Sequence, residues 1–292
     1  PTTEMATPNA VWTIDFKGEF RTGDRRYCYP LTLRDGFSRY VLRCDALLSR
    51  SYALTRARFE RAFADYGLPV RIRSDNGGPF AGPGLGRLSR LNVWWIRLGI
   101  VPERIGLGRP EQNGSHEQFH RVLKADTTRP PAATARAQQR RFGAFYREYN
   151  EVRPHESLDD QPPATRYTAS PRPLPTRLAP LEYPGHMEVR RVSSAGCISW
   201  HGIPIFLTEV LEGEDVGFDE TAQDDVARIA AGATGPLKDR YTEDVGRIVR
   251  SLRRDRTATA GEVVWAGAVR VDDANATVLV ATDGTREDRR TR

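Results

Sequence analysis

The feature that most constrains the fold of this 292-residue chain is a change of hydrophobic period near residue 50. Residues 11–20, VWTIDFKGEF, alternate apolar with polar positions, and residues 27–35 and 38–47 continue the alternation, which predicts three consecutive strands. From residue 54 to residue 66 apolar side chains recur at helical spacing, and Gly67 follows as a stop signal. This order predicts an antiparallel meander followed by a helix.

The elements that follow alternate between strand and helix. We expect strands over 69–75 and 99–105, and helices over 85–98, 113–126 and 132–153. Together with the first three strands, this order indicates an α/β core that spans residues 1–160.

The rest of the chain changes in composition twice. Proline dominates residues 161–186, which predicts an extended linker and a domain boundary. Residues 187–220 are short strands punctuated by glycine, and we expect a small all-β module that is incomplete. Residues 221–292 form a predicted α+β tail, with a helix over 237–254 and strands over 261–273 and 276–284.

Composition limits the classes of function. The chain has 44 basic and 38 acidic residues, a formal net charge of +6, and only three lysines, so 41 of the cations are arginine. Arginine binds phosphate in bidentate geometry, and this balance favours a polyanionic partner such as nucleic acid, although a GC-rich coding sequence would give the same bias. The three cysteines are too few for a disulfide framework, and no apolar run could span a bilayer, so we expect a cytoplasmic protein without membrane contact. Because the sequence begins with Pro1 and not Met, we also expect it to be part of a longer chain.

Three carboxylates carry the predicted chemistry. Asp15 falls in the middle of the first predicted strand, Asp75 at the carboxyl end of the fourth, and Glu117 one turn inside a later helix. Two strands and a helix can bring such side chains into one pocket, where carboxylate oxygens bind hard divalent cations. Two such ions support phosphodiester chemistry by activating the attacking oxygen and stabilising the leaving one.

Each carboxylate also has a simpler interpretation. Asp75 precedes Asn76 and Gly77, a turn signature, and Glu117 has basic residues at i+4 and i+7 that could form surface ion pairs. Glu111 competes for the third position, although it falls in the loop before the helix. His116 and His120 have the i,i+4 spacing of some zinc sites, but no HExxH pattern surrounds them, so DNA contact or surface placement is favoured.

An ordered set of motifs resembles the catalytic core of DDE transposases and retroviral-type integrases, and more closely an insertion-sequence transposase subfamily. The matching stretches are VWTIDFKGEF, IRSDNGGPF and GRPEQNGSHEQFHRVLK, followed by YNEVRPHESL and VRRVSSAGCISWHG, and they cover about residues 1–220. The resemblance implies a ribonuclease-H-like fold, with a mixed five-stranded sheet and flanking helices. It also implies metal-dependent nicking of DNA and strand transfer by the freed 3′-hydroxyl.

By residue, the resemblance makes Asp15, Asp75 and Glu117 the catalytic triad that binds two Mg²⁺ or Mn²⁺ ions. It matches Lys124 to a basic position that contacts DNA. A wider DNA-binding set is predicted on and beside two helices: Asn113, His120, Arg121, Lys124, Arg129, Arg140 and Arg141. The implied partners are DNA, both element ends and target, and further copies of the chain, with a location at the bacterial nucleoid.

The resemblance ends near residue 220. Members of that group carry a helix-turn-helix region ahead of the core, and none is visible here, so a catalytically silent DNA-binding relic is the alternative function. The tail resembles part of the extracytoplasmic domain of membrane proteins associated with mammalian-cell-entry operons, which implies a gene fusion. A ribonuclease or junction nuclease on the same fold is a third possibility.

Overall fold

A computed structural model describes residues 3–82, 88–105, 114–183, 185, 187–200, 203–218, 268–272 and 275–279. The chain divides into two units, one formed by residues 1–81 and 89–179 and the other by residues 82–88 and 180–292. The predicted helix over 237–254 and the residues Glu111 and Asn113 lie outside the described part of the chain. No helix in the described part is both long and apolar enough to cross a membrane.

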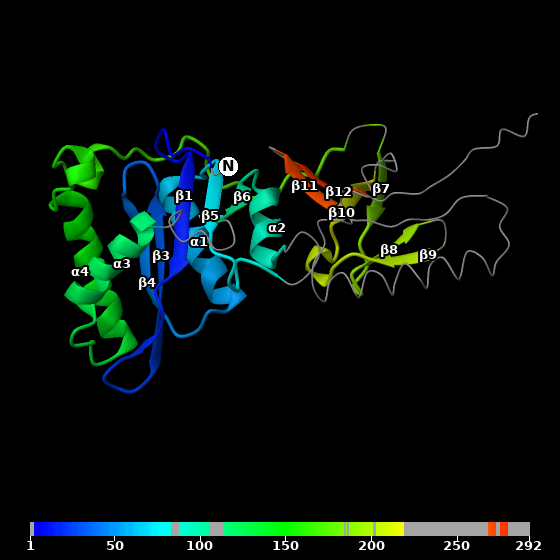
Figure 1. Cartoon of the computed structure of the whole chain (residues 1–292). Coiled ribbons are helices and arrows are strands. Elements are labelled where there is room, and N and C mark those ends of the chain that lie inside the picture. The colour runs from blue at the N-terminus through cyan, green and yellow to red at the C-terminus, as the bar shows by residue number, and fades with distance from the viewer. Residues whose placement is uncertain are drawn as a thin grey trace, which may run out of the picture. The chain divides into compact units, whose positions relative to one another are not determined.

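A mixed sheet forms the centre of the first unit (Figure 1). Its strands are β1 Val11–Phe16, β2 Phe20–Arg21, β3 Tyr27–Asp35, β4 Val41–Leu47, β5 Arg71–Ser74 and β6 Val101–Arg104. β4, β3 and β1 are antiparallel neighbours, and β5 and β6 continue the sheet in parallel with β1. The predicted mixed five-stranded sheet is thereby confirmed, and the two-residue β2 pairs with β3 as a sixth strand.

Helices cover both faces of this sheet. They are α1 Tyr52–Tyr66, α2 Arg90–Arg97, α3 Gly114–Thr127 and α4 Ala135–Glu151. Trp12, Ile14 and their neighbours pack with the aromatic side chains of α1 and α2 in one cluster. Cys28 and Cys44 pack with α3 and α4 in a second cluster. Because successive residues of a strand point to opposite faces, this division puts Thr13 and Asp15 of β1 on the α3 side.

Capping residues decide where the helices begin and end. Ser51 accepts the Leu54 N–H at the start of α1, and Gly67 ends the helix at φ 75°, as the sequence predicts. The helix predicted from residue 85 instead begins at Arg90, because Ser89 and Asn92 form a capping box.

Part of the proline-rich segment packs against the first unit. Arg172 donates hydrogen bonds to the carbonyl oxygens of Pro69 (2.8 Å), Leu98 (3.1 Å) and Gly99 (2.8 Å). The Tyr167 ring stacks on Tyr40 with 4.4 Å between centroids. This stretch is therefore held by specific contacts along the rim of the core.

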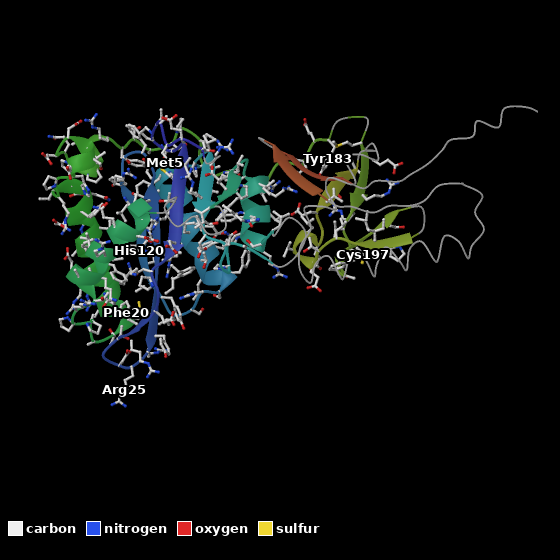
Figure 2. All side chains as sticks on the ribbon, viewed as in Figure 1. Met5, Phe20, Arg25, His120, Tyr183 and Cys197 are labelled. Carbon is white, nitrogen blue, oxygen red and sulfur yellow. The ribbon has the colours of Figure 1, made fainter. Side chains whose placement is uncertain are left out.

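The second unit is built from short strands. They are β7 Glu188–Arg191, β8 Cys197–Trp200, β9 Ile203–Phe206, β10 Asp215–Phe218, β11 Ala268–Asp272 and β12 Asn275–Leu279. β8 pairs with β9, and the other four form a sheet in the order β11-β12-β10-β7. Of the three free cysteines, Cys197 lies on β8 in this unit (Figure 2), and Cys28 and Cys44 are buried in the first.

Candidate active site

The ends of β1 and β5 bring two of the predicted carboxylates to the same edge of the sheet. Asp15 is the next-to-last residue of β1, not a mid-strand residue as the sequence pattern suggested. β1 and β5 are parallel, with Thr13 level with Arg73. Continuing this register by two residues places Asp75 beside Asp15, on a neighbouring strand about 4.8 Å away.

Aromatic packing fixes the loop that carries Asp75. Phe80 is fully buried, and its ring stacks on Phe16 of β1 with 5.5 Å between centroids. Asn76 donates a hydrogen bond to the Ile105 carbonyl at 3.0 Å, which ties the same loop to the end of β6. The loop after β5 is therefore anchored to the strand that carries Asp15.

The Asp75 carboxylate accepts a hydrogen bond from the Gly77 N–H at 3.1 Å. This is an Asx turn, so the turn interpretation of the sequence is realised. The same bond directs the carboxylate into its own loop, and Asp75 does not line the pocket that holds the other two carboxylates. The sequence therefore predicted the place of Asp75 along the sheet but not its side-chain direction.

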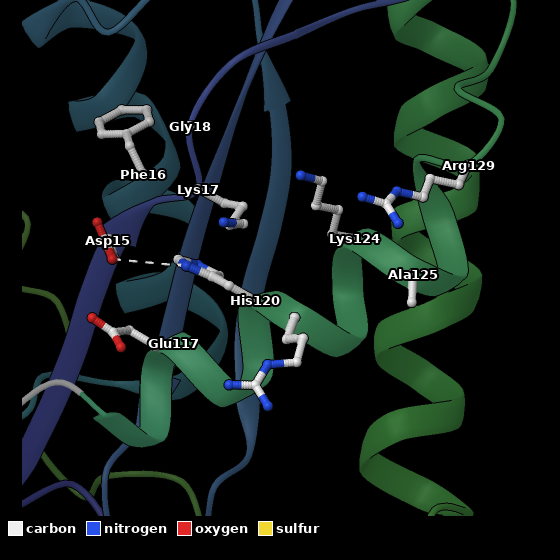
Figure 3. A pocket seen from close by; sticks show the side chains of 10 residues that line it. Asp15, Phe16, Lys17, Gly18, Glu117, His120, Lys124, Ala125 and Arg129 are labelled. Atoms are coloured by element: carbon white, nitrogen blue, oxygen red, sulfur yellow. Dashed lines mark ion pairs between the residues drawn. The ribbon is translucent and has the colours of Figure 1, made fainter.

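Asp15 and Glu117 line one open pocket of about 600 Å³ (Figure 3). Glu117 is exposed in the first turn of α3, and the Asp15 side chain is 18% exposed at the end of β1. Arg34 holds this end of α3 against the sheet by donating to the Ser115 carbonyl at 2.8 Å, with its guanidinium 4.8 Å from the Phe119 ring centre. The helix therefore presents Glu117 over β1.

Cations form much of the wall of the same pocket: Lys17, Arg121, Lys124 and Arg129. Lys124 lies on the face of α3 that carries Glu117, as its spacing of seven residues predicts. Lys17 was not predicted, although its place directly after Asp15 at the end of a strand was a usable signal. Four cations beside two carboxylates give a pocket that attracts phosphate groups.

Three members of the predicted DNA-binding set stand apart from the pocket wall. Arg140 and Arg141 are exposed on α4, where Arg141 donates to the Pro130 carbonyl at 2.6 Å, and neither lines the pocket. Asn113 is outside the described residues.

The predicted surface placement of His116 and His120 is wrong. Both rings are buried, at 1% and 4% exposure, because α3 turns them toward the sheet and away from solvent. The Thr32 hydroxyl lies 2.7 Å from Nε2 of each ring, and Thr13 Oγ1 lies 3.0 Å from Nδ1 of His116. These contacts join residues more than eighty positions apart, so no spacing in the sequence could reveal them.

His120 also lies close to Asp15, with 3.7 Å between Nδ1 and Oδ2 (Figure 3). Burial, with the nearby charges of Lys17 and Arg34, lowers the pKa of His120 to about 3. Burial lowers the pKa of His116 well below its ordinary value as well. Both imidazoles are therefore neutral at pH 7, and the contact with Asp15 is not an ion pair there.

The chemistry of the donor set suits a hard divalent cation, since carboxylate oxygens are the side-chain ligands that Mg²⁺ binds. Among the described residues, however, no three His, Cys, Asp or Glu side chains gather closely enough to hold a metal ion. Asp15 and Glu117 share the pocket, and Asp75 is the carboxylate that points elsewhere.

The chain is similar to integrase cores in sequence. Two families described as Integrase core domain match it, one over residues 6–110 and one over residues 98–163. Over 154 residues it is 29% identical to the 31.7-kDa protein of insertion element IS407 from Burkholderia multivorans, which covers 52% of this chain and 53% of that protein. Over 162 residues it is 32% identical to the 39.2-kDa protein of insertion element IS476 from Xanthomonas euvesicatoria, which covers 54% and 44%. The chain thus spans about half the length of these relatives.

Among solved structures, the HTLV-2 integrase catalytic core domain in complex with magnesium aligns with 56% of this chain and 98% of its own, at 16% identity and a TM-score of 0.41. The order of strands, the pocket between β1 and α3, and the two family matches agree. The chain therefore carries an integrase core domain of the insertion-element transposase type over residues 6–163.

Proposed function

We propose that the first unit is the catalytic domain of a transposase that nicks DNA and transfers the cut strand with the help of divalent metal ions. The observation that carries this proposal is the pocket in which Asp15 and Glu117 lie among four cations, with Asp75 level with Asp15 on the adjacent strand. The sequence relationship to insertion-element proteins supports it.

In this mechanism Asp15, Asp75 and Glu117 hold two Mg²⁺ or Mn²⁺ ions. Asp75 would exchange its bond to the Gly77 N–H for the ion. When bound, such ions lower the pKa of a coordinated oxygen nucleophile and stabilise negative charge on the leaving oxygen.

The cations of the pocket wall position the DNA. Lys17, Arg121, Lys124 and Arg129 neutralise the phosphates on either side of the reacting one. Water attacks that phosphorus first, which breaks its bond to the 3′ oxygen and leaves a free 3′-hydroxyl. This hydroxyl then attacks a phosphodiester of the target, forms a new P–O bond and releases another 3′-hydroxyl.

We infer that the partners are the ends of a mobile element and a target duplex in chromosomal DNA. A further copy of the chain would hold the second end, since two ends must react together.

The test is cleavage and strand transfer on duplex DNA by the full chain with Mg²⁺ or Mn²⁺. We expect Asp15→Asn, Asp75→Asn and Glu117→Gln each to lower the rate by about 100-fold or more, because each removes charge that stabilises the transition state. DNA affinity should change little. Asp65→Asn is the matched control, since Asp65 lies on α1, on the other face of the sheet.

Wild-type rates in Asp75→Asn would contradict the triad. Salt-sensitive DNA binding by the wild type without any metal-dependent cleavage would favour the alternative, a DNA-binding relic. Cleavage restricted to RNA–DNA hybrids would instead indicate a ribonuclease.

A further inference from the structure

Three buried side chains form a hydrogen-bonded group beneath the pocket: Thr32 of β3 with His116 and His120 of α3. The Thr32 hydroxyl lies 2.7 Å from Nε2 of both imidazoles and 3.1 Å from the backbone carbonyl oxygen of Asp15. Thr32 is paired with Asp15 across the β1–β3 ladder, so the group sits directly beside this carboxylate.

A count of protons determines the tautomers of the two rings. The hydroxyl has one proton, and the Asp15 carbonyl can only accept, so the bond between them uses that proton. Both imidazoles must then donate to the hydroxyl through Nε2–H. Each neutral ring carries a single N–H, so Nδ1 of each has a lone pair and no proton. Nδ1 of His116 satisfies this by accepting from the Thr13 hydroxyl, 3.0 Å away.

Nδ1 of His120 directs its lone pair toward Asp15 Oδ2, 3.7 Å away. Two acceptors that face each other repel unless a cation or a donor lies between them. Ligand atoms that share one six-coordinate ion with bonds of about 2.1 Å lie about 3.0 Å apart at adjacent positions and about 4.2 Å apart at opposite ones. The observed separation falls inside this range.

We propose that Nδ1 of His120 is a nitrogen ligand of the divalent ion that Asp15 binds, and that Thr32 is the positioning residue that fixes its tautomer. This inference rests on the proposed function and adds a side chain to the three carboxylates. A site with one imidazole binds Mn²⁺ better, relative to Mg²⁺, than a site of oxygen ligands alone.

The test is pulsed electron paramagnetic resonance of Mn²⁺ bound to the full chain, prepared with ¹⁴N-histidine and separately with ¹⁵N-histidine. We expect a nitrogen coupling that changes between the two samples, because only a histidine ligand carries the label. Mn²⁺ bound without a histidine coupling overturns this inference and leaves the carboxylate site of the proposed function intact. Failure of Mn²⁺ to bind overturns both.

Variants assign the signal to one residue. In His120→Gln the coupling should vanish while Mn²⁺ still binds, with affinity lower by about tenfold or more. Thr32→Val should weaken binding by about 10- to 100-fold, since the ring is no longer held in the required tautomer. His155→Gln is the matched control, because His155 packs on Tyr149 and does not line the pocket.

Unchanged coupling and affinity in Thr32→Val would overturn the positioning role. A coupling that persists in His120→Gln would overturn the assignment to His120. If His120→Gln does not fold, the labelled wild-type spectra alone decide whether histidine binds the ion.

Discussion

Single residues in this protein show how far sequence reasoning reaches into a site. The strand pattern predicts that Asp15 and Asp75 are neighbours, and the β1–β5 register agrees, since it pairs residues that are sixty positions apart. The sequence does not show that Asp75 turns into its own loop, because Asn76-Gly77 is equally compatible with either direction. The buried state of His116 and His120 depends on where α3 packs, which no local pattern encodes.

The three cysteines should differ in reactivity. Cys28 and Cys44 are buried, and desolvation raises the pKa of Cys28 to about 12 and that of Cys44 well above its ordinary value. Cys197 is partly exposed. Because thiolate and not thiol reacts, we expect iodoacetamide at pH 8 to label Cys197 alone in the folded protein and all three cysteines in denaturant. Mass spectrometry of peptides would measure this, and rapid labelling of Cys44 in the folded protein would contradict its burial.

The same thiols make stability depend on pH. An unfolded thiol loses its proton near its ordinary pKa of 9, whereas folded Cys28 keeps its proton up to about 12. The stability linked to Cys28 is therefore present below pH 9 and is lost as pH rises from 9 toward 12. Denaturant melts across this window should show a smaller decline in Cys28→Ser than in the wild type, once the two are compared relative to their own values at pH 8.

At the scale of elements, local signals decided most of the outcome. The period change predicted the meander and α1, and Gly67 ended α1 as expected. The start of α2 was wrong because Leu85 and Leu88 extend its apolar pattern, while the Ser89–Asn92 capping box fixes the first turn. A cap satisfies backbone N–H groups directly and so outweighs a continuing pattern of side chains.

Two glycines provide a matched test of this level. At Gly67, φ is 75° and an added Cβ would lie 2.5 Å from the Ser170 carbonyl oxygen, so Gly67→Ala should lower the free energy of unfolding by about 1 to 3 kcal/mol. Gly143 lies inside α4, where a Cβ would meet only the Arg147 guanidinium at 3.7 Å. Gly143→Ala should raise the free energy of unfolding by about 0.5 to 1 kcal/mol. Thermal melts that showed equal shifts for both would contradict this account.

For the whole molecule, charge is the property that composition predicts and the structure locates. The net charge of +6 indicated a polyanionic partner, and four cations line the pocket beside the carboxylates. Composition could not place these charges, because their gathering depends on the end of β1 meeting one face of α3.

DNA binding should therefore weaken steeply with salt. In Arg121→Ala/Lys124→Ala, the slope of log affinity against log salt concentration should become shallower by about 2, because each cation lost releases about one fewer counterion. The control is Arg61→Ala/Arg90→Ala, on exposed positions of α1 and α2 across the sheet, which should keep the wild-type slope. Fluorescence anisotropy with labelled duplex DNA measures both, and equal slopes in the two variants would contradict a DNA path along α3.

The contacts of Arg172 bear on how this catalytic unit can be excised for study. A fragment cut at residue 160, where the sequence pattern of the core ends, would discard a side chain that bonds three backbone carbonyls, together with the Tyr167 ring stacked on Tyr40. A fragment of residues 1–179 retains both. We expect the longer fragment to melt cooperatively, and the shorter one to melt at a lower temperature and to expose Tyr40 to solvent. The useful edge of the domain lies where the chain stops touching it, about twenty residues beyond its last α-helix.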